Sequence, residues 1–218
     1  MPNPTTPNPR SRPTIVVVHG LWMTGAVLAL QRAQLARRGY RALAFSYPSL
    51  RLPLDEIAAR LARFVVALGA SRVHLVGHSL GGLVVLNMLA LHPHVPAGRI
   101  VLLGSPVKGA SAASHLAHSA IGRAVVGRAM LDWQPERGVA VAAQWDVGMI
   151  AGTVRLGLGR FLVPLPAPND GMVRLDETRM PGLRDHLTMP LSHSGMIFSS
   201  RAANQICHFL EHGSFSHN

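Results

Sequence analysis

Short apolar runs rich in β-branched residues alternate at a steady pitch with helical patterns through the first half of the chain. The first run, TIVVV at 14–18, is typical of a strand buried on both faces of a sheet. Residues 54–68 place apolar side chains at intervals of three and four, which predicts an amphipathic helix closed by Gly69. This alternation predicts an α/β fold, with a mostly parallel sheet and helices on both of its faces. Further strands are predicted at 41–47, 72–76 and 99–103, and further helices at 28–38 and 80–91.

The alternation breaks at Gly104 and resumes at Val147. The stretch between them is rich in Ala, Gly and His, and it shows only weak helical spacing, between Ala112 and Met130. We interpret it as a small helical cap inserted into the fold at about residues 105–146. After the cap we expect strands at 147–151 and 186–191 and a final helix at 200–211. The predicted organisation is therefore a proline-rich tail at 1–13 and a single domain at 14–212, without internal repeats.

The chain is strongly basic, with 21 Lys+Arg against 10 Asp+Glu and a formal net charge of +11. Apart from Lys108 these cations are arginines, but no basic run exceeds the pair at 37–38, and no aromatic residues are interleaved with them. Such interleaving would supply the stacking platforms of a nucleic-acid site, so a solvated basic face is the better interpretation. No nucleic-acid partner is predicted, whereas weak association with an anionic membrane surface stays open as an alternative.

We expect neither a signal peptide nor a membrane span in this sequence, although a mature form cut from a precursor would look the same. Residues 1–13 are rich in proline and asparagine and lack the apolar segment of a signal peptide. The longest stretch without acidic or basic residues, at 73–98, contains glycines, histidines and two prolines. Its apolar run falls short of the roughly 20 residues that a span needs. Cys207 is the single cysteine, which excludes an internal disulfide, and we expect a cytoplasmic protein.

Residues 77–81 read Gly-His-Ser-Leu-Gly, a G-x-S-x-G motif between a predicted strand and a predicted helix. The two glycines permit the strained turn that lifts a serine above the edge of a sheet. The N-terminus of the following helix offers backbone N–H groups to a developing oxyanion. A glycine-rich turn without chemistry is the alternative, but the position between strand and helix favours catalysis. We therefore predict that Ser79 is a nucleophile.

A serine nucleophile needs a base and an acid that orients the base. His193 lies in Leu-Ser-His-Ser-Gly directly after the last predicted strand, where a loop would hold it over the carboxyl edge of the sheet. His186 opens that strand at the opposite edge and is a weaker candidate. His115 and His118 are three residues apart on the cap and lack a third metal ligand. His193 is therefore the predicted base, with a polar loop histidine as the alternative.

The predicted acid is Asp170, in the loop Pro-Asn-Asp-Gly-Met-Val at 168–173. Proline and glycine around this residue suit a fixed turn on the way to the base. Asp146 precedes a strand and would lie at the wrong edge of the sheet. Asp176 and Glu177 also precede His193 and remain competitors, and a surface carboxylate is the alternative for each residue.

Two backbone N–H groups are needed to bind the oxyanion. One belongs to Leu80, the residue after the predicted nucleophile. The other should come from the loop after the first strand, His-Gly-Leu-Trp at 19–22, and we select Leu21.

Four ordered motifs, VVVHGLW, VGHSLGG, PNDGMV and LSHSG, together resemble the α/β-hydrolase superfamily. The resemblance is strongest to small bacterial lipases and esterases, including the PGAP1-like group, and it extends from residue 14 to residue 210. It implies a three-layer α/β-hydrolase fold. It also implies that Ser79, Asp170 and His193 form the triad and that Leu21 and Leu80 line the oxyanion hole.

The activity predicted from these residues is hydrolysis of carboxylic esters through an acyl-enzyme. Apolar residues of the cap favour an aliphatic ester or a lipid as substrate. A thioesterase or an acyltransferase could use the same triad, and the fold also serves binding proteins without catalysis. No cofactor or metal is predicted, because residues 104–109 lack the Lys-Ser/Thr of a phosphate loop and the chain contains no H-E-x-x-H.

Overall fold

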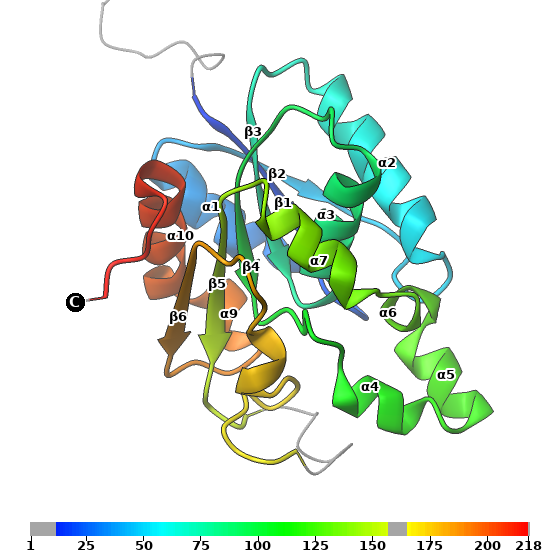
Figure 1. Ribbon diagram of the computed structural model, residues 1–218. Helices are drawn as coiled ribbons and strands as arrows, with labels where there is room; N and C mark the ends of the chain where they lie inside the picture. The colour runs from blue at the N-terminus through cyan, green and yellow to red at the C-terminus, as the bar shows by residue number, and fades with distance from the viewer. Residues whose placement is uncertain (1–11, 157–164, 218) are drawn as a thin grey trace, which may run out of the picture.

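A computed structural model of the chain describes residues 12–156 and 165–217. Of the predicted tail, residues 1–11 lie outside the described residues. The described chain forms a six-stranded sheet in the order β2-β1-β3-β4-β5-β6, in which every neighbouring pair is parallel (Figure 1). This confirms the predicted sheet. Its strands are β1 (Thr14–Val18), β2 (Arg41–Phe45), β3 (Val73–His78), β4 (Ala97–Leu103), β5 (Val147–Gly152) and β6 (Asp185–Met189).

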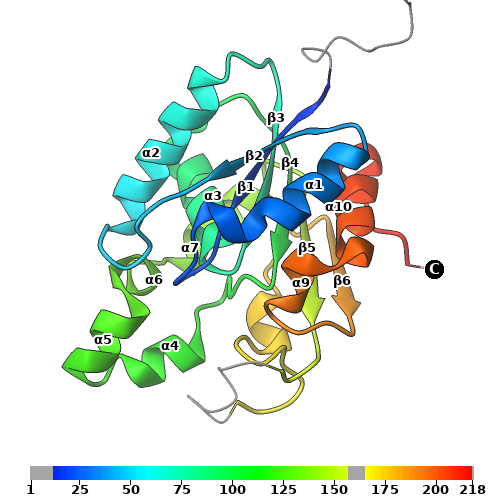
Figure 2. The same ribbon diagram turned by 180° about the vertical axis from the view of Figure 1, so that it is seen from behind.

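The sheet separates two apolar clusters, because successive side chains of a strand point to opposite faces. In β1, Val16 and Val18 belong to one cluster, whereas Ile15 and Val17 belong to the other. The first cluster lies beneath α2 (Leu54–Ala67), α3 (Leu80–Leu91) and α7 (Pro135–Ala142). The second lies beneath α1 (Ala29–Arg37), α9 (Gly195–Phe198) and α10 (Ser200–His212), which cover the face shown in Figure 2. The expected three layers are therefore present.

Helix α3 is buried on all sides, from Leu80 to Leu89. It lies between the sheet on one side and α2 and α7 on the other, so it needs no polar face. The uncharged stretch at 73–98 is thus explained by a central strand followed by a central helix. Across residues 12–156 and 165–217, no helix has both the length and the apolar character that crossing a bilayer requires.

Several elements differ from their predicted limits. Strand β6 ends at Met189 because Pro190 follows and has no N–H to donate. Strand β4 begins at Ala97, which pairs with Val73, and the register shifts between this pair and the next, Leu75 with Ile100. Two short 3₁₀ helices, η2 (Gly25–Leu28) and η3 (Leu175–Thr178), were not predicted, because single turns carry no periodic pattern.

The region predicted as a cap contains α4 (Ser111–Leu116), α5 (Ala120–Val126) and α6 (Arg128–Leu131), followed by α7. The side chain of Ser119 accepts a hydrogen bond from the Gly122 N–H and starts α5, whereas Gly127, at φ 76°, ends it. Figure 1 shows α4 and α5 beyond the ends to which β5 and β6 point. Helix α7 packs on α3 instead and belongs to the layer over the sheet. The segment 105–146 therefore combines an outlying helical part with one helix of the central fold.

Candidate active site

Ser79 occupies a sharp turn between β3 and α3. Its backbone has φ 54° and ψ −123°, a conformation that a residue other than glycine adopts only under strain. A Cβ at Gly77 would lie 2.4 Å from Gly82 Cα, and a Cβ at Gly81 would lie 2.2 Å from the carbonyl oxygen of Val18. Both motif glycines are thus required by close backbone approach. The predicted strand–turn–helix context of Ser79 is present in the structure.

His193 lies in the short loop between β6 and α9. Its Nδ1 is 2.7 Å from Oδ2 of Asp170, and its side chain is almost fully buried. Its backbone N–H donates to the carbonyl oxygen of Asp170 at 2.9 Å. The hydrogen bond at Nδ1 leaves Nε2 as the nitrogen available to a reacting group. The structure thus brings together two residues that sequence reasoning had selected from separate loops.

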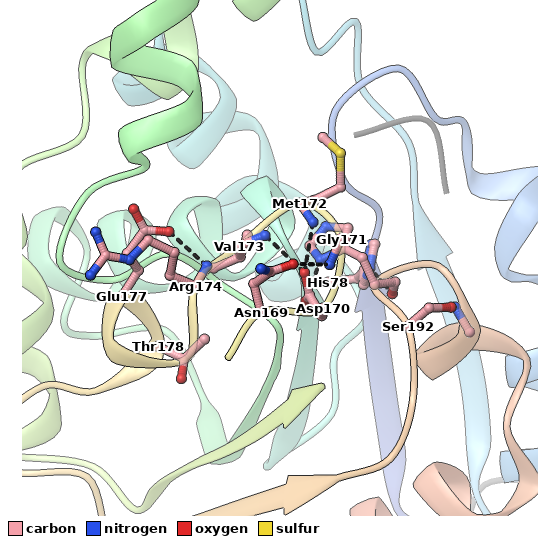
Figure 3. Close-up of polar contacts among 12 residues, drawn as sticks. His78, Asn169, Asp170, Gly171, Met172, Val173, Arg174, Glu177, Thr178 and Ser192 are labelled. Atoms are coloured by element: carbon pink, nitrogen blue, oxygen red, sulfur yellow. Dashed lines mark hydrogen bonds and ion pairs between the residues drawn. The ribbon is translucent and has the colours of Figure 1, made fainter. Parts of the chain in front are cut away.

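The carboxylate of Asp170 is held by its own loop (Figure 3). Oδ1 accepts hydrogen bonds from the N–H groups of Met172 and Val173, at 2.9 and 2.8 Å. The neighbouring Asn169 fixes the same turn, because its Oδ1 accepts from the Gly171 N–H at 3.0 Å. Burial by itself would raise the pKa of Asp170. The His193 imidazole and the two N–H groups outweigh burial and hold this pKa below its ordinary value.

The competing carboxylates have other partners. Asp176 is exposed and pairs with Arg174. Asp146 pairs with Arg99, in line with its predicted place before β5. Glu177 is buried, and its two oxygens accept from the N–H groups of Arg174 at 2.9 Å and Ser111 at 2.7 Å. Glu177 therefore ties the start of α4 to the loop that carries Asp170.

The competing histidines also lie elsewhere. His186, at the start of β6, has Nε2 2.9 Å from the hydroxyl of Thr178. His115 and His118 meet edge to face on the cap, with ring centroids 6.3 Å apart. Within the described residues no group of three or more His, Cys, Asp or Glu side chains is arranged to hold a metal ion.

The loop selected for the oxyanion hole is anchored on both sides of Leu21. The rings of His19 and Tyr47 are stacked, with centroids 4.3 Å apart. His19 Nε2 accepts a hydrogen bond from the Tyr47 N–H, and its Nδ1 donates one to the Gly20 carbonyl oxygen. Burial lowers the pKa of His19 despite its two hydrogen bonds, which favours the neutral form of this ring. On the other side, Trp22 has φ 58°, and its N–H donates to Ser49 Oγ at 3.2 Å. The roles assigned to Leu21 and Leu80 stay predictions.

Ser79 and His193 line one cavity of about 390 Å³. Leu21 and Trp22 from the loop after β1 contribute to its wall. The lining is predominantly apolar, and residues of the cap and of the Asp170 loop contribute to it. These residues are Pro106, Ala110, Ala112, Ala113, Leu116, Val126, Met130, Met172 and Val173. A cavity of this size and character suits a small apolar ligand.

Sequence reasoning missed three residues of this region. His78 contacts the loop of His193, and Asn169 fixes the turn that carries Asp170. Trp22 joins the loop after β1 to α5, because its Nε1–H donates to the Val125 carbonyl oxygen. All three lie inside the motifs that resemble the α/β-hydrolase superfamily, and His78 and Asn169 directly precede Ser79 and Asp170. Their position next to Ser79 and Asp170 was the available signal. The partners of Trp22 are distant in sequence and left no such signal.

A parallel sheet with helices on both faces, together with a serine elbow at its carboxyl edge, defines the α/β-hydrolase class. In sequence, a model of the alpha/beta hydrolase family matches residues 15–202. The chain therefore belongs to the alpha/beta hydrolase family.

Solved structures resemble most of the chain. The mature lipase BlEst2 of Bacillus licheniformis superposes with a TM-score of 0.73 at 23% identity, over 95% of this chain and 94% of the lipase. The metagenomic carboxyl esterase MGS0156 superposes with a TM-score of 0.69 at 17% identity, over 96% of this chain and 82% of the esterase. Phospholipase PlaB of Legionella pneumophila superposes with a TM-score of 0.72 at 15% identity, over 92% of this chain and 60% of the phospholipase. At these identities the likeness establishes the fold. No curated protein matches the chain in sequence.

Proposed function

We propose that the protein is a serine hydrolase of carboxylic esters, with Ser79 as nucleophile, His193 as base and Asp170 as acid. The observation that carries the proposal is the buried His193–Asp170 pair, joined at 2.7 Å, because its histidine lines the same cavity as Ser79. A histidine oriented by a carboxylate is what a serine at its ordinary pKa needs to react.

In the proposed mechanism, Ser79 Oγ attacks the acyl carbon while Nε2 of His193 takes the hydroxyl proton. The N–H groups of Leu21 and Leu80 stabilise the oxyanion of the tetrahedral intermediate. Collapse of this intermediate breaks the bond to the leaving alcohol, which receives the proton from His193. Water then attacks the acyl-enzyme with the same base and releases the carboxylic acid. Asp170 stays ionised and stabilises the imidazolium that forms in each half of the cycle.

The preference for carboxylic esters is supported by two observations. The cavity wall is predominantly apolar, which suits an acyl chain better than a charged group. The structural relatives include proteins described as a lipase, a carboxyl esterase and a phospholipase. A thioesterase or an acyltransferase with the same residues is the alternative within enzymes, and a binding protein without turnover is the alternative outside them.

We expect ester hydrolysis to depend on acyl length. Each methylene that enters the apolar cavity contributes about 0.8 kcal/mol, or about fourfold in kcat/KM, until the cavity is filled. In a p-nitrophenyl series from acetate to hexadecanoate, the expected optimum therefore lies between the shortest and the longest chains. A fluorophosphonate probe should add one mass label, which peptide mapping assigns to Ser79.

Three outcomes would contradict this proposal. Labelling of another residue would exclude Ser79 as the nucleophile. Faster turnover of the matched thioesters would favour the thioesterase. Absence of both turnover and labelling in folded protein would favour the binding protein.

A second candidate function is attachment to an anionic lipid surface. The segment 104–131 contains no Asp or Glu but includes Lys108, Arg123 and Arg128, of which Arg128 pairs with the following Asp132 at 3.9 Å. On α5, which also carries Arg123, Ile121 is 80% exposed. A basic surface that also presents apolar side chains has the chemistry of an interfacial membrane site, because cations attract lipid phosphate while apolar groups enter the acyl boundary.

In the Ser79→Ala background, the protein is expected to bind phosphatidylglycerol vesicles at low salt and to detach as the salt concentration rises. Ile121→Ser should weaken binding by about tenfold, because it removes a side chain that would enter the membrane. The matched control is Val66→Ser, since Val66 is also exposed but lies on α2. Absence of vesicle sedimentation at low salt would exclude the site, and equal losses in both variants would exclude the cap as its location.

A further inference from the structure

His78, the residue before Ser79, is completely buried and contacts the loop of the proposed base. Its Nε2 lies 3.0 Å from the backbone carbonyl oxygen of His193, although the two residues are 115 positions apart. The two imidazole rings also meet, with centroids 4.7 Å apart and planes inclined by 50°. The proposed mechanism has no use for His78, so this contact needs its own explanation.

The protonation state of His78 follows from its surroundings. A carbonyl oxygen can only accept, so Nε2 carries the hydrogen and donates it to His193. Burial, together with the nearby His193, lowers the pKa of His78 to about 3, despite the opposing charge of Asp170. A charged His19 would act on the pKa of His78 in the same direction as a charged His193. His78 is therefore a neutral donor throughout the pH range in which an imidazole base works.

This hydrogen bond completes the attachment of His193. The His193 N–H donates to the Asp170 carbonyl oxygen at 2.9 Å, and its Nδ1 pairs with the Asp170 carboxylate. Those two bonds fix the base relative to the acid only. The bond from His78 joins the base loop to the strand end that carries Ser79. Because His78 and Ser79 are covalently adjacent, this bond links the base loop directly to the residue that precedes the nucleophile.

We propose that His78 is a positioning residue of the proposed catalytic site, which sets the distance between Ser79 and His193 through its Nε2–H bond to the His193 backbone. The inference rests on the proposed function. Because the bond from His78 would act on the geometry of the transition state, its removal is expected to lower kcat with little change in KM.

The decisive variants differ in whether a donor reaches the His193 carbonyl oxygen. Glutamine places its amide nitrogen where histidine has Nε2, whereas leucine has no donor and asparagine is too short. We expect His78→Leu and His78→Asn to lower kcat on a p-nitrophenyl ester by tenfold or more, with KM within about twofold. His78→Gln should recover most of the loss. Equal kcat in the wild type and in the folded His78→Asn protein would overturn the proposal, as would a loss in His78→Gln equal to that in His78→Leu.

A spectroscopic measurement separates failure of this inference from failure of the proposed function. The His193 Nδ1 proton, hydrogen-bonded to Asp170, should give a far-downfield proton resonance, which His193→Ala identifies by removing it. Loss of the anchor frees the base loop, so we expect this resonance to broaden or vanish in His78→Leu and to persist in His78→Gln. A sharp, unshifted resonance in His78→Leu would overturn the proposal even in a protein that hydrolyses no ester.

Discussion

Replacing Ser79 by alanine is expected to lower kcat/KM for the preferred ester by a factor of about 10³ to 10⁶. The variant keeps the cavity and the His193–Asp170 pair but has no oxygen to form the acyl-enzyme. His193→Ala should cost a similar factor, because an unactivated serine hydroxyl is a weak nucleophile. The double variant should be little worse than either single one, since residues that act as a unit lose their effect together. Initial rates with active-site titration measure all three.

The matched control is Ser194→Ala, because Ser194 lines the same cavity as Ser79 without occupying the strained elbow. It is expected to stay within a few-fold of the wild type. A thermal melt tests whether each variant is folded. Activity in folded Ser79→Ala close to that of the wild type would refute a serine mechanism, and additive losses in the double variant would place Ser79 and His193 in separate roles.

Asp170→Asn is expected to lower kcat by about 10² to 10⁴, with a smaller change in KM. An amide in place of the carboxylate cannot stabilise the imidazolium of His193, and it can present N–H where Nδ1 now finds an acceptor. The lowered pKa of Asp170 keeps the carboxylate charged at neutral and mildly acidic pH. Its contribution to folding is present above the ordinary pKa of an aspartate and is lost as the pH falls through the lowered value.

Asp176→Asn is the control for this experiment, because Asp176 lies in the following turn and pairs with Arg174 on the surface. It should leave kcat within about twofold of the wild type, since an exposed ion pair contributes little. A large loss of kcat in Asp176→Asn together with a small one in Asp170→Asn would make Asp176 the acid in place of Asp170. Comparable losses in both would indicate damage to the loop.

The parallel sheet was predictable because its strands are continuous apolar runs and its helices have periodic faces. TIVVV at 14–18 and the apolar spacing of 54–68 each specify one kind of element, and the structure confirms both. Strand limits were less accurate where a local cause intervened, as at Pro190, which ends β6 early. The family was predictable for a related reason, since four short motifs occur in the required order along one chain.

The arrangement around the proposed triad could be predicted only in part. Asp170 and His193 were selected by their loops, and the structure joins them at 2.7 Å. The tie from Glu177 to the start of α4 and the bond from His78 to His193 depend on contacts across 66 and 115 positions. No local pattern encodes contacts of that kind. Helix α7 was missed because a short helix in an alanine- and glycine-rich segment has little periodic signal.

The order of the strands implies that the proposed site is completed late in the synthesis of the chain. Ser79 lies at the end of β3 in the interior of the sheet, whereas His193 follows β6, which is the last strand to be synthesised and forms an edge. A nascent chain that has released β1 to β5 already contains the elbow but has neither the base nor the hydrogen bond from His78. Under the proposed mechanism, Ser79 would therefore lack its base until β6 and the loop that carries His193 have joined the sheet. Hydrolytic activity in a growing chain would accordingly report completion of the sheet.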